Sequence, residues 1–247
     1  MVLTRRAIDV RYRGSFLGVY WSLLNPAVMS AVYAAVFGKT FTPYYAGSTL
    51  QYVISVFIGL VTLNFFVSAT HAALTSIVDQ AALINKVRIP LEAFPISAIC
   101  AQTFQLGAGC VPLMVILALA VARNPWHVLL IPIPIAALVA LALGVGFVVA
   151  LLYVHFRDVA HMYDVFAFLL WITSPVFYPL AIVPDRVRSW LYLNPLLTIL
   201  QSLRDVVLHP RLEAPQLLLA DLGIGLVSCA AGWAAFRLAR RHLADLL

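Results

Sequence analysis

A basic stretch that runs directly into a long uncharged segment is the feature that most constrains how this chain can fold. Residues 5–17 read RRAIDVRYRGSFL, and residues 18–37 read GVYWSLLNPAVMSAVYAAVF without a charge. Apolar side chains recur every three or four residues in the first part, which predicts an amphipathic helix on the membrane surface over residues 1–17. As an α-helix, the uncharged segment would rise about 30 Å, the thickness of the hydrocarbon layer. The sequence therefore predicts a surface helix followed by a membrane span.

The composition extends this prediction to the whole chain. Of its 247 residues, 63% are hydrophobic and only 11% are charged, whereas soluble domains carry about 25% charged residues. The net charge of +6 comes from short basic clusters between apolar segments. The tendency of cytoplasmic loops to be basic explains such clusters better than a nucleic-acid-binding face does. We therefore expect a membrane protein of several spans and no nucleic-acid partner.

The gaps between charged residues divide the chain into apolar spans. We predict one all-α transmembrane domain over residues 1–247, with six spans at residues 18–37, 52–74, 94–121, 127–154, 165–180 and 216–236. An even number of spans places both termini on one side of the membrane. Most Lys and Arg residues fall on that side, so both termini are expected in the cytoplasm.

The predicted external loop between the last two spans is too apolar to be an ordinary solvated connection. Residues 181–215 include WLYLNPLLTILQSL, which predicts a re-entrant or interfacial helix partly buried in protein. Asp221 lies about one turn inside the last span. An acid within a membrane is a functional candidate. We favour the alternative that Asp221 lies at the outer interface and snorkels or pairs with an external arginine.

Several residues are expected to shape the helix backbones. Asn25 and Pro26 interrupt the first span and predict a kink there. Pairs of glycines, which allow helices to approach closely, occur at Gly14 and Gly18, Gly144 and Gly146, and Gly223 and Gly225.

Aromatic residues form two groups. One is a stripe on the first span with a spacing of four residues, and the other surrounds the fifth span. The members are Tyr33, Phe37 and Phe41, and then Phe166, Phe168, Trp171, Phe177 and Tyr178. An interfacial belt and ordinary helix packing would explain both groups. The alternative is a conduit whose flat faces contact the C–H surfaces of sugar rings without fixing one register, which suits a moving polymer.

We find no catalytic constellation and no metal site in the sequence. The six histidines are scattered, and the three cysteines fall in apolar segments without metal-ligand spacing. Gly38-Lys39-Thr40 resembles the end of a phosphate-binding loop, but Tyr33 stands where that motif needs glycine. The chain is therefore expected to bind no cofactor itself.

The predicted cytoplasmic loop after the second span reads DQAALINKVRIP over residues 79–90. A short helix that stops before the proline would protrude and could dock into a groove of a partner protein. Its polar members are Asp79, Asn85, Lys86 and Arg88. The alternative is a simple solvated turn.

Several segments together resemble a known family. DVRYRGSFLGVYWSLLNP (residues 9–26) is similar to the opening of type-2 ABC exporter permeases that move lipid-linked polysaccharides, such as O-antigen and teichoic acid exporters. The similarity continues in order through LINKVRIP (83–90), FRDV (156–159), SPVFYP (174–179) and LNPL (193–196). The first segment is fairly specific, whereas the others are weak alone.

The resemblance implies a homodimer in the bacterial inner membrane, paired with two cytoplasmic ATPase subunits that carry ATP and Mg²⁺. The family's interface helix corresponds to residues 3–16 and its coupling helix to residues 79–89. Its first and fifth spans border the translocation path, where this chain has its two aromatic groups. This chain would then be a transport subunit and not an enzyme.

The leading hypothesis is export of an undecaprenyl-linked polysaccharide, driven by ATP hydrolysis on the partner. Guanidinium groups of Arg5, Arg6, Arg11 and Arg13 could bind the phosphates of the lipid head group, or equally the anionic membrane lipids. An exporter of drugs or small lipids is the alternative within the superfamily. An ion-coupled secondary transporter is the alternative from another class, but it needs ionisable groups at mid-membrane, and spans two to five contain essentially none.

Overall fold

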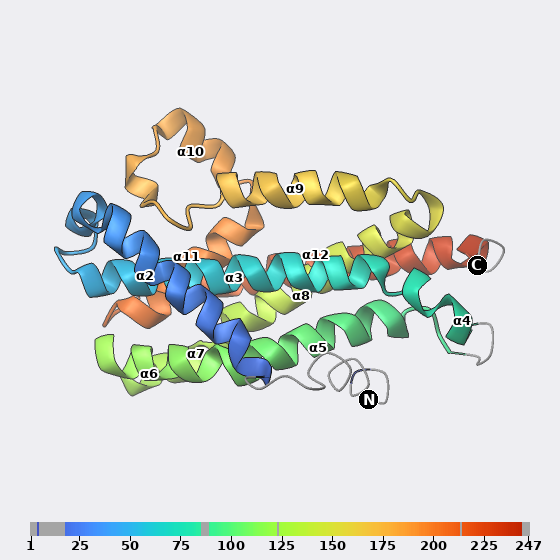
Figure 1. Ribbon diagram of the computed structural model, residues 1–247, viewed down its shortest axis with the longest axis horizontal. Helices are drawn as coiled ribbons and strands as arrows, with labels where there is room; N and C mark the ends of the chain where they lie inside the picture. The colour runs from blue at the N-terminus through green and yellow to red at the C-terminus, as the bar shows by residue number, and fades with distance from the viewer. Residues whose placement is uncertain (1–3, 5–17, 85–88, 123, 213, 244–247) are drawn as a thin grey trace.

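The computed structural model describes Thr4 and residues 18–84, 89–122, 124–212 and 214–243 (Figure 1). Within these ranges every regular element is a helix, which confirms the all-α prediction. The predicted surface helix over residues 1–17 lies outside the described residues, apart from Thr4 and the adjoining Gly18. The same holds for eight residues singled out from the sequence, namely Arg5, Arg6, Arg11, Arg13, Gly14, Asn85, Lys86 and Arg88.

Most of the long helices run roughly along one axis, α2 crosses them obliquely, and shorter helical pieces join them (Figure 1). The long helices are α2 (Trp21–Phe41), α3 (Thr49–Thr75), α5 (Ala93–Gly109), α8 (Pro132–His155), α9 (Val159–Thr173) and α12 (Pro215–Leu243). The shorter ones are η1 (Gly18–Tyr20), η2 (Thr42–Tyr44), η3 (Val78–Gln80), α4 (Ala81–Ile84), α6 (Val111–Val121), α7 (Pro125–Leu130), η4 (Leu180–Ile182), α10 (Asp185–Leu191) and α11 (Pro195–Leu208).

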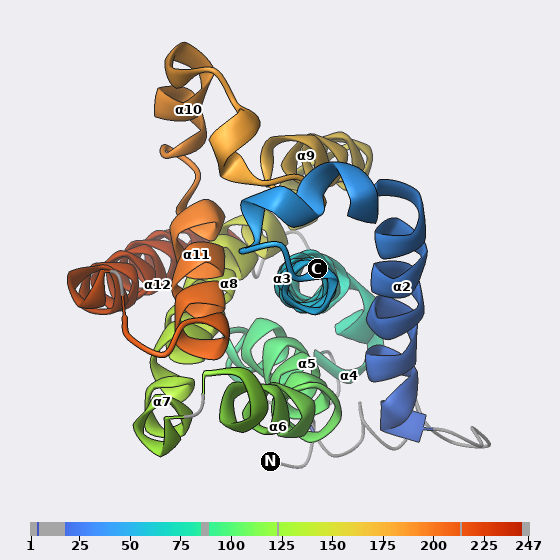
Figure 2. The same ribbon diagram turned by 90° about the vertical axis from the view of Figure 1, so that its left-hand side faces the viewer.

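Helix α3 forms the centre of the bundle, as the end-on view shows (Figure 2). In its most apolar stretch of 18 residues 78% are buried, compared with 11% for α2. A helix that is apolar on all sides is expected in such a position. Two of its buried threonines bond within the helix: the Thr62 hydroxyl donates to the Ile58 carbonyl at 2.8 Å, and the Thr70 hydroxyl donates to the Phe66 carbonyl at 2.6 Å. This pairing lets a hydroxyl be buried where water is excluded.

Among the described residues, four helices are long and apolar enough to cross a membrane, and a fifth candidate is the pair α5 and α6, bent by 41°. The predicted third span, 94–121, therefore consists of two helices that meet at Cys110. In the predicted fifth span, 165–180, the helix instead begins at Val159 and ends at Thr173. Pro175 and Pro179 explain this end, because proline lacks the amide hydrogen that a helix needs. The count of six spans stays a prediction.

The apolar loop over residues 181–215 does contain a buried helix. Helix α11 packs against α3, α6 and α12, and its first turn is capped by Asn194, whose side chain accepts a hydrogen bond from the Leu196 amide at 3.0 Å. Pro195 follows at the first helical position, where its missing amide hydrogen costs nothing. Whether α11 re-enters the membrane stays a prediction.

The structure contradicts our expectation for Asp221. This side chain is buried between α12 and α11, where its carboxylate accepts a hydrogen bond from the Ser202 hydroxyl. It therefore neither snorkels to an interface nor pairs with an arginine among the described residues. The sequence did not reveal this contact because Ser202 belongs to the loop helix α11, whose position depends on tertiary packing.

Helices α8 and α12 make the closest helix contact of the fold. A Cβ atom added at Gly144 would lie 2.3 Å from the Ser228 carbonyl oxygen, and one at Gly225 would lie 2.5 Å from that of Ala137. Both glycines were predicted to allow close approach, and this is confirmed. The prediction of close approach was wrong for Gly223, the partner of Gly225 in the sequence pattern, because a Cβ there would meet no atom within 4 Å. Gly232, which the pattern did not include, makes the tightest contact.

Candidate functional site

Seven aromatic side chains from distant parts of the sequence form one connected group, which we call the aromatic cluster. Its members are Tyr33, Phe37, Phe41, Tyr45, Tyr52, Trp171 and Phe177. On α2, the spacing of four residues places Tyr33, Phe37 and Phe41 on one face. Their successive ring centroids lie 6.1 and 6.0 Å apart, with the rings nearly parallel. The predicted stripe on the first span is therefore an actual row of stacked rings.

The row continues at both ends through other elements. Phe177, in the irregular segment after α9, stacks on Tyr33 with a centroid separation of 4.0 Å, and Trp171 stacks on Phe177 at 5.9 Å. At the opposite end, Phe41 lies 5.9 Å from Tyr52, which in turn lies 5.4 Å from Tyr45. The cluster therefore extends from the end of α9, along α2, to the start of α3.

Hydrogen bonds fix the segment that carries Phe177. The Tyr52 hydroxyl donates to the Phe177 carbonyl at 2.9 Å. Arg204, fully buried on α11, donates to the Ser55 carbonyl from Nε and Nη2, both at 3.2 Å, and to the Val176 carbonyl from Nη2 at 3.1 Å. One guanidinium thus joins α11, α3 and the segment after α9, and so positions the ring that stacks on Tyr33.

Gly59 provides the space for this arrangement. A Cβ atom there would lie 3.0 Å from Cγ1 of Val176 and 3.2 Å from Nη2 of Arg204. The absent side chain therefore lets the segment after α9 and the guanidinium both lie close to α3.

The cluster is partly accessible. Phe37 is 39% exposed, whereas Tyr52 is fully buried. The remaining members are half-buried and pack against the core. The rings therefore stabilise the helix contacts and leave Phe37 accessible, so the two interpretations of the sequence are compatible.

Three of the predicted aromatic residues lie apart from the cluster. Phe166 contacts the ring of Tyr163, at 6.1 Å, on another part of α9. Phe168 is 63% exposed, and the Tyr178 hydroxyl donates to the Ile172 carbonyl at 3.1 Å. The group predicted around the fifth span is therefore divided, with only Trp171 and Phe177 stacking in line with α2.

The sequence analysis did not identify Tyr45, Tyr52 or Arg204 as site residues. Tyr45 and Tyr52 flank the turn between the first two spans, where aromatic residues are common at membrane interfaces. Arg204, with Asp205, is part of the family resemblance, but it also gave a signal for burial: it is a cation within the apolar sequence TILQSLRDVVL. Such a residue has to find partners inside the protein.

The predicted coupling loop is described in part. Asp79 lies exposed in η3. Just before it, Ile77 is buried with Phe94, Phe147 and Phe236, and Leu83 packs against this group. Apolar side chains therefore pack the described part of the loop against α5, α8 and α12, whereas its polar Asp79 is exposed.

Pro26 lies inside α2, which continues without a break to Phe41. The kink expected at Asn25 and Pro26 stays a prediction. Among the residues that the structure describes, no three His, Cys, Asp or Glu side chains lie close enough to hold a metal ion.

A helical bundle with several membrane-length helices and a row of aromatic rings is the architecture of a multi-pass membrane protein. The family model of the ABC-2 type transporters matches residues 1–208, so this chain belongs to that family. The membership expected from the sequence segments is therefore confirmed, and the chain is a multi-pass protein of a transporter family.

Curated relatives cover nearly the full chain. The O-antigen export system permease protein RfbA of Myxococcus xanthus is 29% identical over 98% of this chain and 93% of its own length. A protein of the same name from Klebsiella pneumoniae is 22% identical over 100% of this chain and 94% of its own.

Proposed function

We propose that this chain is the membrane subunit of an ATP-driven exporter that moves an undecaprenyl-linked, O-antigen-like polysaccharide across the bacterial inner membrane. The observation that carries the proposal is the aromatic cluster, in which rings stack in one row along α2 and onto Phe177. Flat rings attract the C–H faces of sugars without holding one register. Family membership and the names of the relatives, O-antigen export system permease proteins, support the same cargo.

A second copy of the chain would complete the path. Helix α2 exposes a continuous set of apolar side chains, including Leu24, Val28 and Val32, and α9 exposes Val165 and Leu169. Both helices also contribute rings to the aromatic cluster, Tyr33 from α2 and Trp171 from α9. In a homodimer, two such faces would enclose a conduit with aromatic rows from both copies, and the remaining apolar surface would contact lipid.

Energy would come from two ATPase subunits on the cytoplasmic side, where both termini are expected to lie. Their groove would receive the loop that begins at Asp79 and contains Asn85, Lys86 and Arg88. The arginines at positions 5, 6, 11 and 13 would lie at the same surface. There they would bind the pyrophosphate of the cargo lipid bidentately.

Reconstitution tests the proposal directly. The chain is placed in vesicles with its ATPase subunit, and movement of an undecaprenyl-pyrophosphate-linked glycan to the vesicle lumen is measured with and without ATP. We expect ATP-dependent transfer and faster ATP hydrolysis when the glycan lipid is present. Stimulation by drugs or short lipids instead would support the small-lipid exporter, and transport without any ATPase would support a secondary transporter.

The aromatic row itself is tested by removing two of its rings. Replacing Tyr33 and Phe37 with alanine is expected to slow export about tenfold, since each lost aromatic contact is worth about 0.5–1.5 kcal/mol. Assembly with the ATPase should be unchanged because neither residue lies in the coupling loop. Phe168→Ala is the matched control: it removes an exposed ring outside the cluster. Equal export by the wild type, the double variant and Phe168→Ala would mean that the rings of Tyr33 and Phe37 serve only packing.

A further inference from the structure

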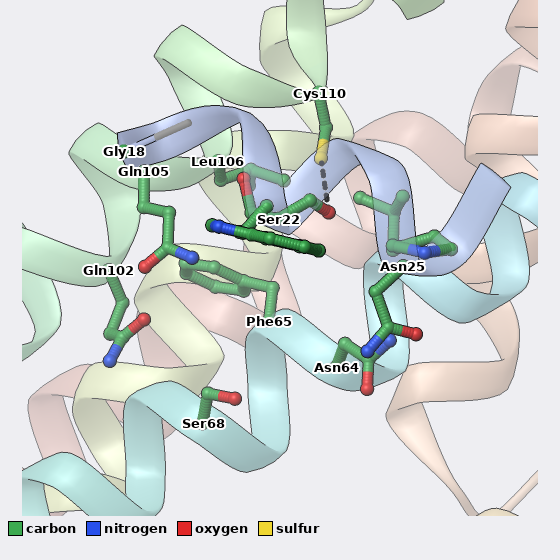
Figure 3. A pocket seen from close by; sticks show the side chains of 13 residues that line it. Gly18, Ser22, Asn25, Asn64, Phe65, Ser68, Gln102, Gln105, Leu106 and Cys110 are labelled. Carbon is green, nitrogen blue, oxygen red and sulfur yellow. Dashed lines mark hydrogen bonds between the residues drawn. The ribbon is translucent and has the colours of Figure 1, made fainter. Parts of the chain in front are cut away.

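A second site lies nearer the start of α2 than the aromatic cluster and shares none of its residues. It is a pocket of about 330 Å³ between the start of α2, the middle of α3 and the end of α5 (Figure 3). Polar side chains from all three helices line it, namely Ser22, Asn25, Asn64, Ser68, Gln102 and Gln105. In a helical membrane protein, so many polar groups around one open space are unexpected, because each is costly to bury without a partner.

Two glutamines make the pocket a built site. Gln102 is only 7% exposed although it lines the open space. The side-chain oxygen of Gln105 is buried and has no hydrogen-bond partner among the described residues. A buried amide left unpaired costs about 1–3 kcal/mol. A ligand that donates a hydrogen bond to Gln105 would remove this cost.

The shape of the pocket depends on a close contact at one edge. A Cβ atom at Gly109 would lie 2.3 Å from the Ser22 hydroxyl and 3.3 Å from the Val19 carbonyl. The Cys110 thiol donates to the Ser22 carbonyl at 3.4 Å. The start of α2 is therefore held against the end of α5, and the pocket remains between this contact and α3.

The lining indicates the chemical class of the ligand. Amides and hydroxyls offer both donors and acceptors, and in the described part of the chain no charged side chain lines the pocket. The rings of Trp21 and Phe65 add aromatic surface. Ligand pockets range from about 300 to 1,000 Å³, so this one suits a group of one or two rings. A neutral, hydroxyl-rich ring meets all these conditions.

We propose that this pocket binds a single sugar ring of the lipid-linked cargo, held by the amides of Asn25, Asn64, Gln102 and Gln105. The assignment of the ring to the cargo rests on the proposed function. The glycerol head group of phosphatidylglycerol carries similar hydroxyls, so the test includes this lipid as the competing source. Ring binding here would hold the cargo near the start of α2, outside the aromatic row.

A cysteine at Ser68, an exposed position on the pocket lining, reports on occupancy. The native Cys100 and Cys229 are replaced by alanine, and Cys110 by serine, whose hydroxyl keeps a donor for the Ser22 carbonyl. The complex with the ATPase subunit is placed in phosphatidylcholine nanodiscs. Modification of Ser68→Cys by a small polar methanethiosulfonate is timed after adding undecaprenyl pyrophosphate carrying one N-acetylglucosamine, undecaprenyl pyrophosphate alone, or phosphatidylglycerol. Thr49→Cys, exposed on the same helix outside the pocket, is the control site.

We expect the sugar-bearing lipid alone to slow modification at position 68, by about tenfold, with no change at position 49. Replacing Gln102 and Gln105 with methionine, which keeps length and helix propensity, should abolish this protection. The same change at the exposed Gln216 should preserve it. Equal protection by undecaprenyl pyrophosphate or by phosphatidylglycerol overturns the proposal, and so does rapid modification with every lipid.

Failure of this proposal and failure of the proposed function can be told apart. ATP-dependent export with no protection at position 68 would overturn the sugar pocket and leave the exporter function standing. Protection by the sugar-bearing lipid without ATP-dependent export would support the pocket and overturn the exporter function.

Discussion

Alanine at Gly232 is expected to force α8 and α12 apart and to destabilise the protein by about 3 kcal/mol. The added Cβ would lie 2.2 Å from the Gly144 carbonyl oxygen and 2.8 Å from the Gly144 Cα. Overpacking costs about 1–3 kcal/mol where side chains can shift. Here the neighbours are backbone atoms, so the whole helix has to move, and the upper end of that range applies. The measurement is thermal unfolding of the purified chain in detergent.

Gly223 provides the matched control on the same helix. A Cβ atom there meets nothing within 4 Å, and alanine favours a helix over glycine by about 0.8–1 kcal/mol. Gly223→Ala should therefore unfold at the same temperature as the wild type or higher. If Gly232→Ala and Gly223→Ala behave alike, α8 and α12 are not in the close contact described.

The composition predicted the fold class correctly because apolar segments of membrane length can only be helical. It could not predict which helix lies at the centre. The segments that became α2 and α3 are both apolar and uncharged over about 20 residues, yet α3 is surrounded by protein and α2 is mostly exposed. That difference arises from packing between distant helices, which no local pattern encodes. The same reason explains the wrong prediction at Gly223. This glycine belongs to the predicted pair on α12, but it lies on a face of the helix where an added Cβ would meet no atom within 4 Å.

The candidate site, too, could be predicted from the sequence only in part. The stacking of Tyr33, Phe37 and Phe41 follows from their spacing on one helix, and the sequence predicted it. Phe177 joins them from a segment without helical structure after α9, whose position no helical spacing predicts. The hydrogen bond from Tyr52 to Phe177 spans 125 positions, and that from Arg204 to Ser55 spans 149. Contacts of this kind exist only in the folded chain.

Replacing Arg204 with methionine is expected to detach the segment that carries Phe177. The guanidinium bonds the carbonyls of Ser55 and Val176, and hydrogen bonds to a charged donor are worth about 1.5–3 kcal/mol each. Methionine fills a similar volume but leaves the Val176 carbonyl without this donor in a buried place. We expect the free energy of unfolding to fall by about 3 kcal/mol, and export to be lost at temperatures where the variant is still folded.

Two further variants distinguish the contribution of the hydrogen bonds to stability and export from that of the charge and from the effect of removing an arginine at the surface. Arg204→Lys keeps the cation, but its single ammonium lacks the planar fork that reaches two carbonyls, so its stability and export should be intermediate. Arg186→Met makes the same substitution at an exposed position on α10 and should leave both properties unchanged. Full export by Arg204→Met would contradict the arrangement, because Phe177 would then hold its place on Tyr33 without the arginine. If the buried guanidinium orders this segment, stability and export both fall in Arg204→Met, and Arg204→Lys lies between that variant and the wild type in both properties.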